Sequence, residues 1–213
     1  MFEMKDKSPI IVYNSDTKQC AEFLLGLISE LANNGWPVNA IVVDAKQFAS
    51  YPPEQRNAKQ RVLYIGEFSE SKTTIKNILD WKFERFGTRY GWHGNKGVIT
   101  FDAKAISVDE FNSLAEFAEN ELKDYNLNIR EKVEKRGLKF SQGYSEWLSK
   151  LKGIKDVRFL IPTEMGAVFE MVRNMDKPDL KQMTEQRQRF AVTFFCYNHL
   201  FDFMGLKDDD NKE

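Results

Sequence analysis

The sequence predicts an α/β fold with an open, doubly wound parallel sheet of about five strands and extra helices at the C-terminal end. Two observations carry this prediction. Short apolar runs rich in β-branched residues, typical of buried strands, recur along the chain, and amphipathic stretches with apolar residues at helical spacing lie between them. Because parallel strands need a crossover connection, usually a helix, this alternation favours a parallel sheet covered on both faces.

The first predicted unit is a strand, a helix and a second strand. The runs PIIVYN (Pro9–Asn14) and PVNAIVVD (Pro37–Asp44) are apolar enough for buried strands. We expect Ser15 or Asp16 to cap the helix between them, because a side-chain oxygen there can accept a hydrogen bond from an unpaired backbone N–H. Gly35 is expected to end that helix.

A second crossover unit follows over residues 61–101. Before it, Tyr51–Pro53 rules out one continuous helix and leaves room for a short helical turn on either side. The predicted elements of the unit are strand Gln60–Gly66, helix Ser71–Phe86 and strand Gly97–Asp102. Ser107 and Glu110 then stand at capping-box spacing before an apolar stripe, which predicts a helix to about Tyr125.

The C-terminal part adds a charged helical stretch, a short fifth strand and two more helices. These elements are predicted at Ile129–Lys152, Val157–Ile161, Thr163–Met175 and Pro178–Met204. With five strands, we expect the sheet order 2-1-3-4-5. We further expect residues 1–162 to form the α/β domain, residues 163–206 a helical extension that packs on it or forms a dimer interface, and residues 207–213 a flexible tail.

The predicted last helix is unusual because Phe190–Met204 is apolar almost all round. A helix without a polar face is either buried or packed in an oligomer interface, so this segment is a candidate homodimer contact as well as a candidate core element. Cys20 and Cys196 lie within helical apolar patterns without a CxxC or a nearby histidine. That context favours two reduced, buried thiols.

The overall composition argues against several classes of protein. There are 31 Lys and Arg residues against 32 Asp and Glu, giving a net charge of −1. This balance gives no electrostatic reason to expect nucleic acid or an anionic membrane as partner. No apolar stretch reaches the roughly 20 residues that span a bilayer, and the N-terminus lacks a signal-peptide pattern. We therefore expect a cytoplasmic protein.

Polar residues follow the predicted strands at the edge where open parallel sheets bind ligands. Hydroxyls and free N–H groups at two predicted helix starts favour phosphate binding. The candidate ligand-binding residues are Ser15, Asp16, Thr17, Glu67, Phe68, Ser69, Ser71, Lys72 and Asp102. An alternative is a Mg²⁺ site built from carboxylates, namely Asp16, Asp44, Glu67 and Asp102. Acidic residues at such junctions equally serve the positive end of a helix dipole, and we assign no metal ligand.

Two segments resemble flavodoxin-like proteins. IVYNSDTKQC (Ile11–Cys20) is similar to the phosphate loop of flavodoxins, with Ser15 and Thr17 at the hydroxyl positions. IKNILDWKFERFGTRYG (Ile75–Gly91) resembles the helix and loop of flavodoxin-like NAD(P)H quinone reductases. The resemblance spans about the first 125 residues and implies a flavodoxin-like fold. It also implies an FMN-dependent NAD(P)H oxidoreductase, with those two hydroxyls on the FMN phosphate and Phe68 against the flavin ring.

The segment GTRYGWHGNKG (Gly87–Gly97) combines rings, donors and glycines, and is predicted as a loop at the amino edge of the sheet. One interpretation is a partner-binding loop, formed by Arg89, Tyr90, Trp92, His93, Asn95 and Lys96. The other is a structured turn whose Tyr90 and Trp92 pack on a neighbouring helix.

No residue pattern in the sequence identifies a reaction. We expect a domain that binds a small phosphorylated or nucleotide-type ligand, or a protein partner. The alternatives are the FMN-dependent oxidoreductase and a non-enzymatic interaction protein that dimerises through Phe190–Met204.

Overall fold

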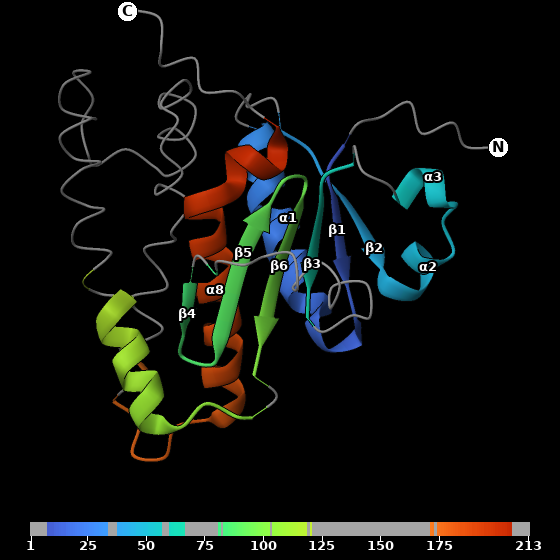
Figure 1. Ribbon diagram of the computed structural model, residues 1–213. Helices are drawn as coiled ribbons and strands as arrows, with labels where there is room; N and C mark the ends of the chain where they lie inside the picture. The colour runs from blue at the N-terminus through green and yellow to red at the C-terminus, as the bar shows by residue number, and fades with distance from the viewer. Residues whose placement is uncertain are drawn as a thin grey trace, which may run out of the picture.

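The computed structural model describes residues 8–33, 38–56, 60–66, 81, 83–102, 104–118, 120, 171–172 and 174–205. Its strands form one six-stranded, mostly parallel sheet in the order β2-β1-β3-β6-β5-β4 (Figure 1). They are β1 (Ile10–Tyr13), β2 (Ile41–Asp44), β3 (Val62–Ile65), β4 (Phe83–Arg85), β5 (Thr88–His93) and β6 (Lys96–Phe101). The helices are the 3₁₀ turn η1 (Ser15–Thr17), α1 (Lys18–Asn33), α2 (Ala45–Ala49), α3 (Pro53–Arg56) and α8 (Leu180–Met204), and residues 108–118 are also helical.

The parallel half of the sheet confirms the α/β class and four of the predicted strands. β1 lies between β2 and β3, and Tyr13 at its end pairs in register with both Asp44 and Ile65. β6 extends the same parallel set on the other side of β3, where Ile65 pairs with Ile99. The carboxyl ends of β2, β1, β3 and β6 therefore meet at one edge of the sheet.

The sheet departs from the prediction beyond β6, where β5 and β4 run antiparallel. The predicted helix Ser71–Phe86 is wrong at its end, because Phe83–Arg85 forms strand β4. The predicted loop Gly87–Gly97 is wrong over most of its length, because Thr88–His93 forms strand β5. The observed order, with two antiparallel strands at one edge, differs from the predicted all-parallel order 2-1-3-4-5.

Two-residue turns join these last three strands. At Phe86 and Gly87 the backbone φ angles are 55° and 64°, both positive, as a type I′ hairpin turn requires. Gly94, with a φ of 59°, takes the first central position of the turn between β5 and β6. Connections this short leave no room for a crossover helix, which is why these strands are antiparallel.

One face of the sheet is covered by α1, by α8 and by the helical residues 108–118. α1 and α8 lie side by side behind the sheet in Figure 1, and α8 packs against β5 and β6. The inward strand residues include Ile11, Leu63, Tyr90 and Ile99, each no more than 2% exposed. This layer forms the larger part of the hydrophobic core.

The opposite face packs on the short helices near the β2 edge. Phe48 of α2 lies against Tyr64 and Tyr51, at ring-centroid distances of 6.1 and 5.6 Å. α2 and α3 are the short helical turns for which the sequence left room around Tyr51–Pro53, and α3 begins at Pro53 itself. Trp81 is partly buried against the same cluster.

α8 is apolar nearly all round because the chain's own elements surround it. Residues 190–196 are all buried, against β5, β6 and α1 among others. Burial within one chain accounts for the composition of Phe190–Met204 without a second copy of the protein. Cys20 and Cys196 are buried and not joined in a disulfide, as predicted, and burial raises the pKa of both thiols.

Two predicted helix boundaries are confirmed in detail. The N–H of Glu110 donates to Ser107 Oγ at 3.2 Å, and the N–H of Ser107 donates to Glu110 Oε2 at 3.0 Å, which completes the capping box. The hydrogen bonds that the Ser107 N–H and the Ser107 hydroxyl donate to Glu110 Oε2 lower the pKa of the Glu110 carboxyl. Gly205, with a φ of 66°, follows the end of α8, and Arg61 Nε donates to the Phe203 carbonyl at 2.9 Å.

Several predictions lie outside the described residues. They are helix Ile129–Lys152, strand Val157–Ile161, most of helix Thr163–Met175, the tail at 207–213 and the candidate ligand residues Glu67, Phe68, Ser69, Ser71 and Lys72. The domain boundaries stay predictions. Within the described ranges, no helix is both long and apolar enough to cross a membrane.

Candidate functional site

A pocket of about 450 Å³ opens at the carboxyl ends of β1, β3 and β6, and we call it the strand-end pocket. Its walls come from residues 14–17 after β1, from Gly66 after β3, from the segment that follows β6, and from the N-terminal half of α8. This is the edge at which the sequence predicted ligand binding.

The loop between β1 and α1 is held against β3 by Thr17. The Thr17 side chain is buried, and its hydroxyl donates to the Ile65 carbonyl at 2.7 Å. The N–H of Asn14 donates back to Thr17 Oγ1 at 3.2 Å, so that Asn14, and not Ser15 or Asp16, occupies the cap position. Gly66, with a φ of 105°, allows this close approach, because a Cβ there would lie 3.1 Å from both Asn14 and Thr17. The first helical turn is thereby fixed at the pocket.

Replacing Thr17 by valine is expected to lower the free energy of unfolding by about 1–3 kcal/mol, because a buried hydrogen bond is lost and the Ile65 carbonyl loses its donor. Urea denaturation of the variant would measure this loss. Ser15→Ala is the control, since Ser15 is exposed and its removal should stay within about 0.5 kcal/mol. A larger loss for Ser15→Ala than for Thr17→Val would contradict the role given to Thr17.

Arg187 of α8 is the one cation of the pocket wall that is buried, with 3% of its surface exposed. Its Nη2 donates to the carbonyl oxygens of Asp102 at 3.1 Å and Lys104 at 3.3 Å. Its Nε–H has no hydrogen-bond partner within the described ranges. Among the described residues no carboxylate lies within 4.0 Å of the guanidinium, so the charge is desolvated without an ion pair.

The electrostatics of this arginine follow from that burial. Desolvation lowers the pKa of Arg187, while the negative charges of Asp102 and Glu110 oppose the shift. An arginine still keeps its proton at neutral pH. The result is a permanent positive charge at the pocket wall, held largely by neutral carbonyl oxygens.

Arg187 reaches the hairpin because residue 87 is a glycine. A Cβ at Gly87 would lie 2.8 Å from Nη1 of Arg187 and 3.2 Å from the Cβ of Asp102. The N–H of Asp102 also donates to the Gly87 carbonyl at 2.7 Å. The β4–β5 turn, the end of β6 and α8 therefore meet at the guanidinium.

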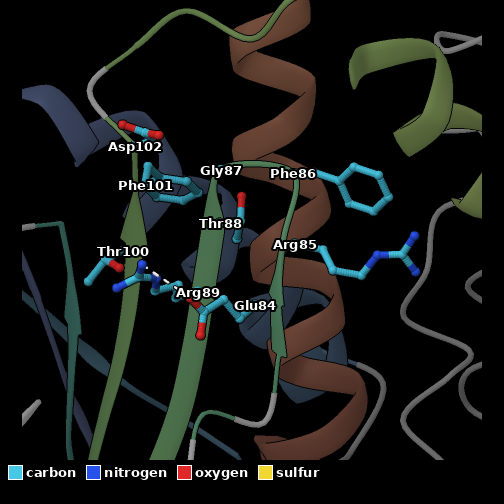
Figure 2. Close-up of a pocket in the computed structure, with 9 residues that line it drawn as sticks. All are labelled: Glu84, Arg85, Phe86, Gly87, Thr88, Arg89, Thr100, Phe101 and Asp102. Carbon is cyan, nitrogen blue, oxygen red and sulfur yellow. Dashed lines mark ion pairs between the residues drawn. The ribbon is translucent and has the colours of Figure 1, made fainter. Parts of the chain in front are cut away.

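A second pocket of about 350 Å³, the hairpin pocket, lies along β4, β5 and the end of β6 (Figure 2). It shares Phe101 and Asp102 with the strand-end pocket. Thr88, the first residue of β5, follows Gly87, and its buried hydroxyl has no hydrogen-bond partner among the residues that the structure describes.

The two arginines of the hairpin pocket, Arg85 and Arg89, already have interaction partners within the described part of the chain. Figure 2 shows Arg89 and Glu84 directed toward each other, in an ion pair of 3.1 Å, while Arg85 points away from them. The Arg85 guanidinium lies over the rings of Phe86 and Phe117, at 4.7 and 5.0 Å. Because these two arginines have partners, the strand-end pocket is the better candidate for an anion.

The strand-end pocket brings together three of the predicted ligand residues, namely Asp16, Thr17 and Asp102. Ser15 does not line it. Asp44 is instead the cap of α2, where its carboxylate accepts from the N–H of Lys46 at 2.8 Å. Within the described ranges, no group of three or more His, Cys, Asp or Glu side chains could hold a metal ion.

Sequence reasoning missed the α8 side of the pocket. Arg187, Thr184 and Gln188 come from a helix that the sequence assigned to the core or to a dimer contact, and Lys104 follows the last predicted strand residue. The available signal was Arg187 itself, a charge three residues before the continuous apolar run of that helix.

The predicted partner-binding residues lie on the two sides of β5, in the turn after it and at the start of β6. Tyr90 is 2% exposed, and its ring lies 6.0 Å from that of Phe195, while the Trp92 ring lies 5.9 Å from that of Phe203. The interpretation in which both rings pack on a neighbouring helix is thus confirmed. Arg89, His93 and Asn95 are exposed and Lys96 is partly buried, so partner binding through them stays a prediction.

Comparisons of the chain with protein-family models, with curated proteins and with solved structures found no match.

Proposed function

We propose that this is a cytoplasmic protein that binds a small phosphorylated or nucleotide-type ligand in the strand-end pocket, with Arg187 as the anchor for the anionic group. One observation carries the proposal, which is the buried guanidinium without a carboxylate partner in the described part of the chain. Burying a charge without a counter-charge costs free energy, and an anionic ligand would offset that cost. The planar fork of arginine also matches the oxygens of a phosphate.

The surroundings of Arg187 support an anionic ligand. The pocket lies at the N-terminal end of the helical segment η1–α1, where unpaired N–H groups and the helix dipole favour negative charge. Lys104 lines the same wall and adds a second cation. The volume of about 450 Å³ falls within the range of about 300–1,000 Å³ that is usual for small-molecule sites.

The flavin alternative gains no support from the two hydroxyls assigned to the FMN phosphate. The Thr17 hydroxyl donates to Ile65, and Ser15 does not line the pocket. FMN therefore enters the test as one compound of the ligand panel and is not proposed as the resident cofactor.

A thermal-shift and calorimetry experiment tests the proposal. Inorganic phosphate, pyrophosphate, AMP and FMN would each be added with and without Mg²⁺, and at least one is expected to raise the melting temperature. At a concentration of about 100 times Kd, a ligand adds about 2.7 kcal/mol of stability. Arg187→Gln is expected to weaken binding of that compound by about 10- to 100-fold, since a charged hydrogen-bond donor is lost.

Arg189→Gln is the matched control, because Arg189 is two residues away on α8, exposed, and packed over Phe23. It should bind like the wild type. Arg187→Lys keeps the charge without the fork and should give an intermediate affinity. The proposal fails if no phosphorylated compound stabilises the protein, or if the Arg187 and Arg189 variants lose affinity equally.

A further inference from the structure

The strand-end pocket holds charges of both signs in one small volume. Arg187 and Lys104 supply the positive charges, and Asp16 and Asp102 supply the negative ones. None of these four side chains forms an ion pair within 4.0 Å with another described residue. Asp16 accepts one long hydrogen bond, from the Ser15 hydroxyl at 3.4 Å, so both carboxylates keep oxygen atoms available to a ligand.

A bare phosphate does not suit this arrangement. It would place negative charge near Asp16 and Asp102, and like charges repel. Ionised carboxylates only accept hydrogen bonds, so they are best occupied by groups that donate. The ligand that matches the pocket carries its anionic group at one end and hydrogen-bond donors at the other.

Neutral hydroxyl groups are the donors that fit the remaining wall. The amide side chains of Asn14 and Gln188 line the same pocket, and an amide both donates and accepts. A hydroxyl does the same, whereas an ammonium group only donates. Phe101 and Ala105 provide apolar lining that a carbon skeleton would cover.

We propose, on the basis of the function proposed above, that the ligand is a phosphorylated polyhydroxy compound, that is, a sugar phosphate or the sugar phosphate part of a nucleotide. Arg187 and Lys104 bind its phosphate, and the carboxylates of Asp16 and Asp102 accept hydrogen bonds from its hydroxyl groups. The two carboxylates thus select for the sugar, and the two cations bind the anion.

The test compares three phosphate monoesters by calorimetry on the full chain. Ribose 5-phosphate carries hydroxyls, butyl phosphate carries none, and O-phosphoethanolamine carries an ammonium group. Ribose 5-phosphate is expected to bind at least about tenfold more tightly than either of the others, since each hydroxyl bonded to a carboxylate contributes roughly that factor. Binding is expected to be the same in EDTA and in Mg²⁺.

Two variants test whether the carboxylates of Asp16 and Asp102 cause the preference for ribose 5-phosphate over butyl phosphate. Asp16→Asn and Asp102→Asn should each weaken ribose 5-phosphate about tenfold while leaving butyl phosphate unchanged or tighter. Asp109→Asn is the control, because Asp109 is exposed on the helical residues 108–118 and does not line the pocket. It should alter neither affinity.

The outcomes separate this inference from the function on which it rests. Equal affinities for ribose 5-phosphate and butyl phosphate, both weakened by Arg187→Gln, would overturn the sugar selectivity and leave phosphate binding intact. Tighter binding of O-phosphoethanolamine, or a requirement for Mg²⁺, would also overturn it. No binding of any of the three, with Arg187→Gln behaving like the wild type, would overturn both.

Discussion

Replacing Phe190 by alanine is expected to lower the free energy of unfolding by about 3–5 kcal/mol. Phe190 is fully buried, and its ring lies 4.3 Å from that of Phe194 and 6.0 Å from that of Phe117, measured between centroids. It also contacts the rings of Phe83 and Phe86 at 5.9 and 6.4 Å. Removing it opens a cavity where α8, the hairpin and the helical residues 108–118 meet.

Urea denaturation monitored by circular dichroism would measure this effect. Val108→Ala serves as the control, because Val108 is 41% exposed at the start of the same helical segment 108–118. Its loss should stay within about 0.5 kcal/mol. A loss below about 1 kcal/mol for Phe190→Ala would mean that this aromatic cluster does not hold α8 on the sheet.

Replacing Gly87 by alanine is expected to lower the free energy of unfolding by about 2–4 kcal/mol and to weaken ligand binding by about 10- to 100-fold, as Arg187→Gln does. The left-handed backbone at residue 87 contributes about 1–2 kcal/mol of this loss for any residue with a Cβ. The rest arises because the new methyl group would displace the Arg187 guanidinium and break its hydrogen bonds to the carbonyls of Asp102 and Lys104.

Gly94 provides a matched control within the same sheet. Its φ of 59° is close to that of Gly87, yet a Cβ at Gly94 would meet no atom within 4 Å. Gly94→Ala should therefore show only the backbone cost of about 1–2 kcal/mol and keep full ligand affinity. If the two alanine variants are equally stable and bind equally well, Gly87 has no part in placing Arg187.

The parallel half of the sheet was predictable because its central strands β1 and β3 are continuous apolar runs buried on both faces. Ile10–Tyr13 and Val62–Ile65 have no polar side chain other than a tyrosine hydroxyl, and such runs are typical of central parallel strands. The capping box at Ser107 and Glu110 was predictable for a different reason, since both bonds are made within four residues. Features that depend on local hydrogen bonds or on strong burial can therefore be predicted from the sequence.

The hairpin was missed because two periodicities compete in the same stretch. Phe83 and Phe86 continue the helical spacing of the residues before them, and this favoured a helix. From Thr88 onward, the buried side chains Thr88 and Tyr90 and the partly buried Trp92 alternate with polar or small residues, a period of two that is typical of a strand. A turn with phenylalanine at a positive φ has no common sequence signal, since type I′ turns favour asparagine and glycine.

The pocket was only half predictable because its two walls come from distant parts of the chain. The ends of β1, β3 and β6 are fixed by topology, so Asp16 and Asp102 could be placed at one edge from the order of strands alone. Arg187 contacts the Asp102 carbonyl across 85 residues of sequence, and this contact depends on how α8 crosses the sheet. No local pattern encodes such a crossing.

The position of α8 after all the described strands also has a consequence for biosynthesis. α8 follows every described strand in sequence, yet it packs on the part of the sheet formed by β5 and β6, which includes Tyr90 and Ile99. During translation this apolar surface stays uncovered by α8 until residues 180–204 have left the ribosome. The hairpin strands β4, β5 and β6, in contrast, can pair as soon as they are made. The nascent protein is therefore expected to be more prone to aggregation before α8 emerges than after it.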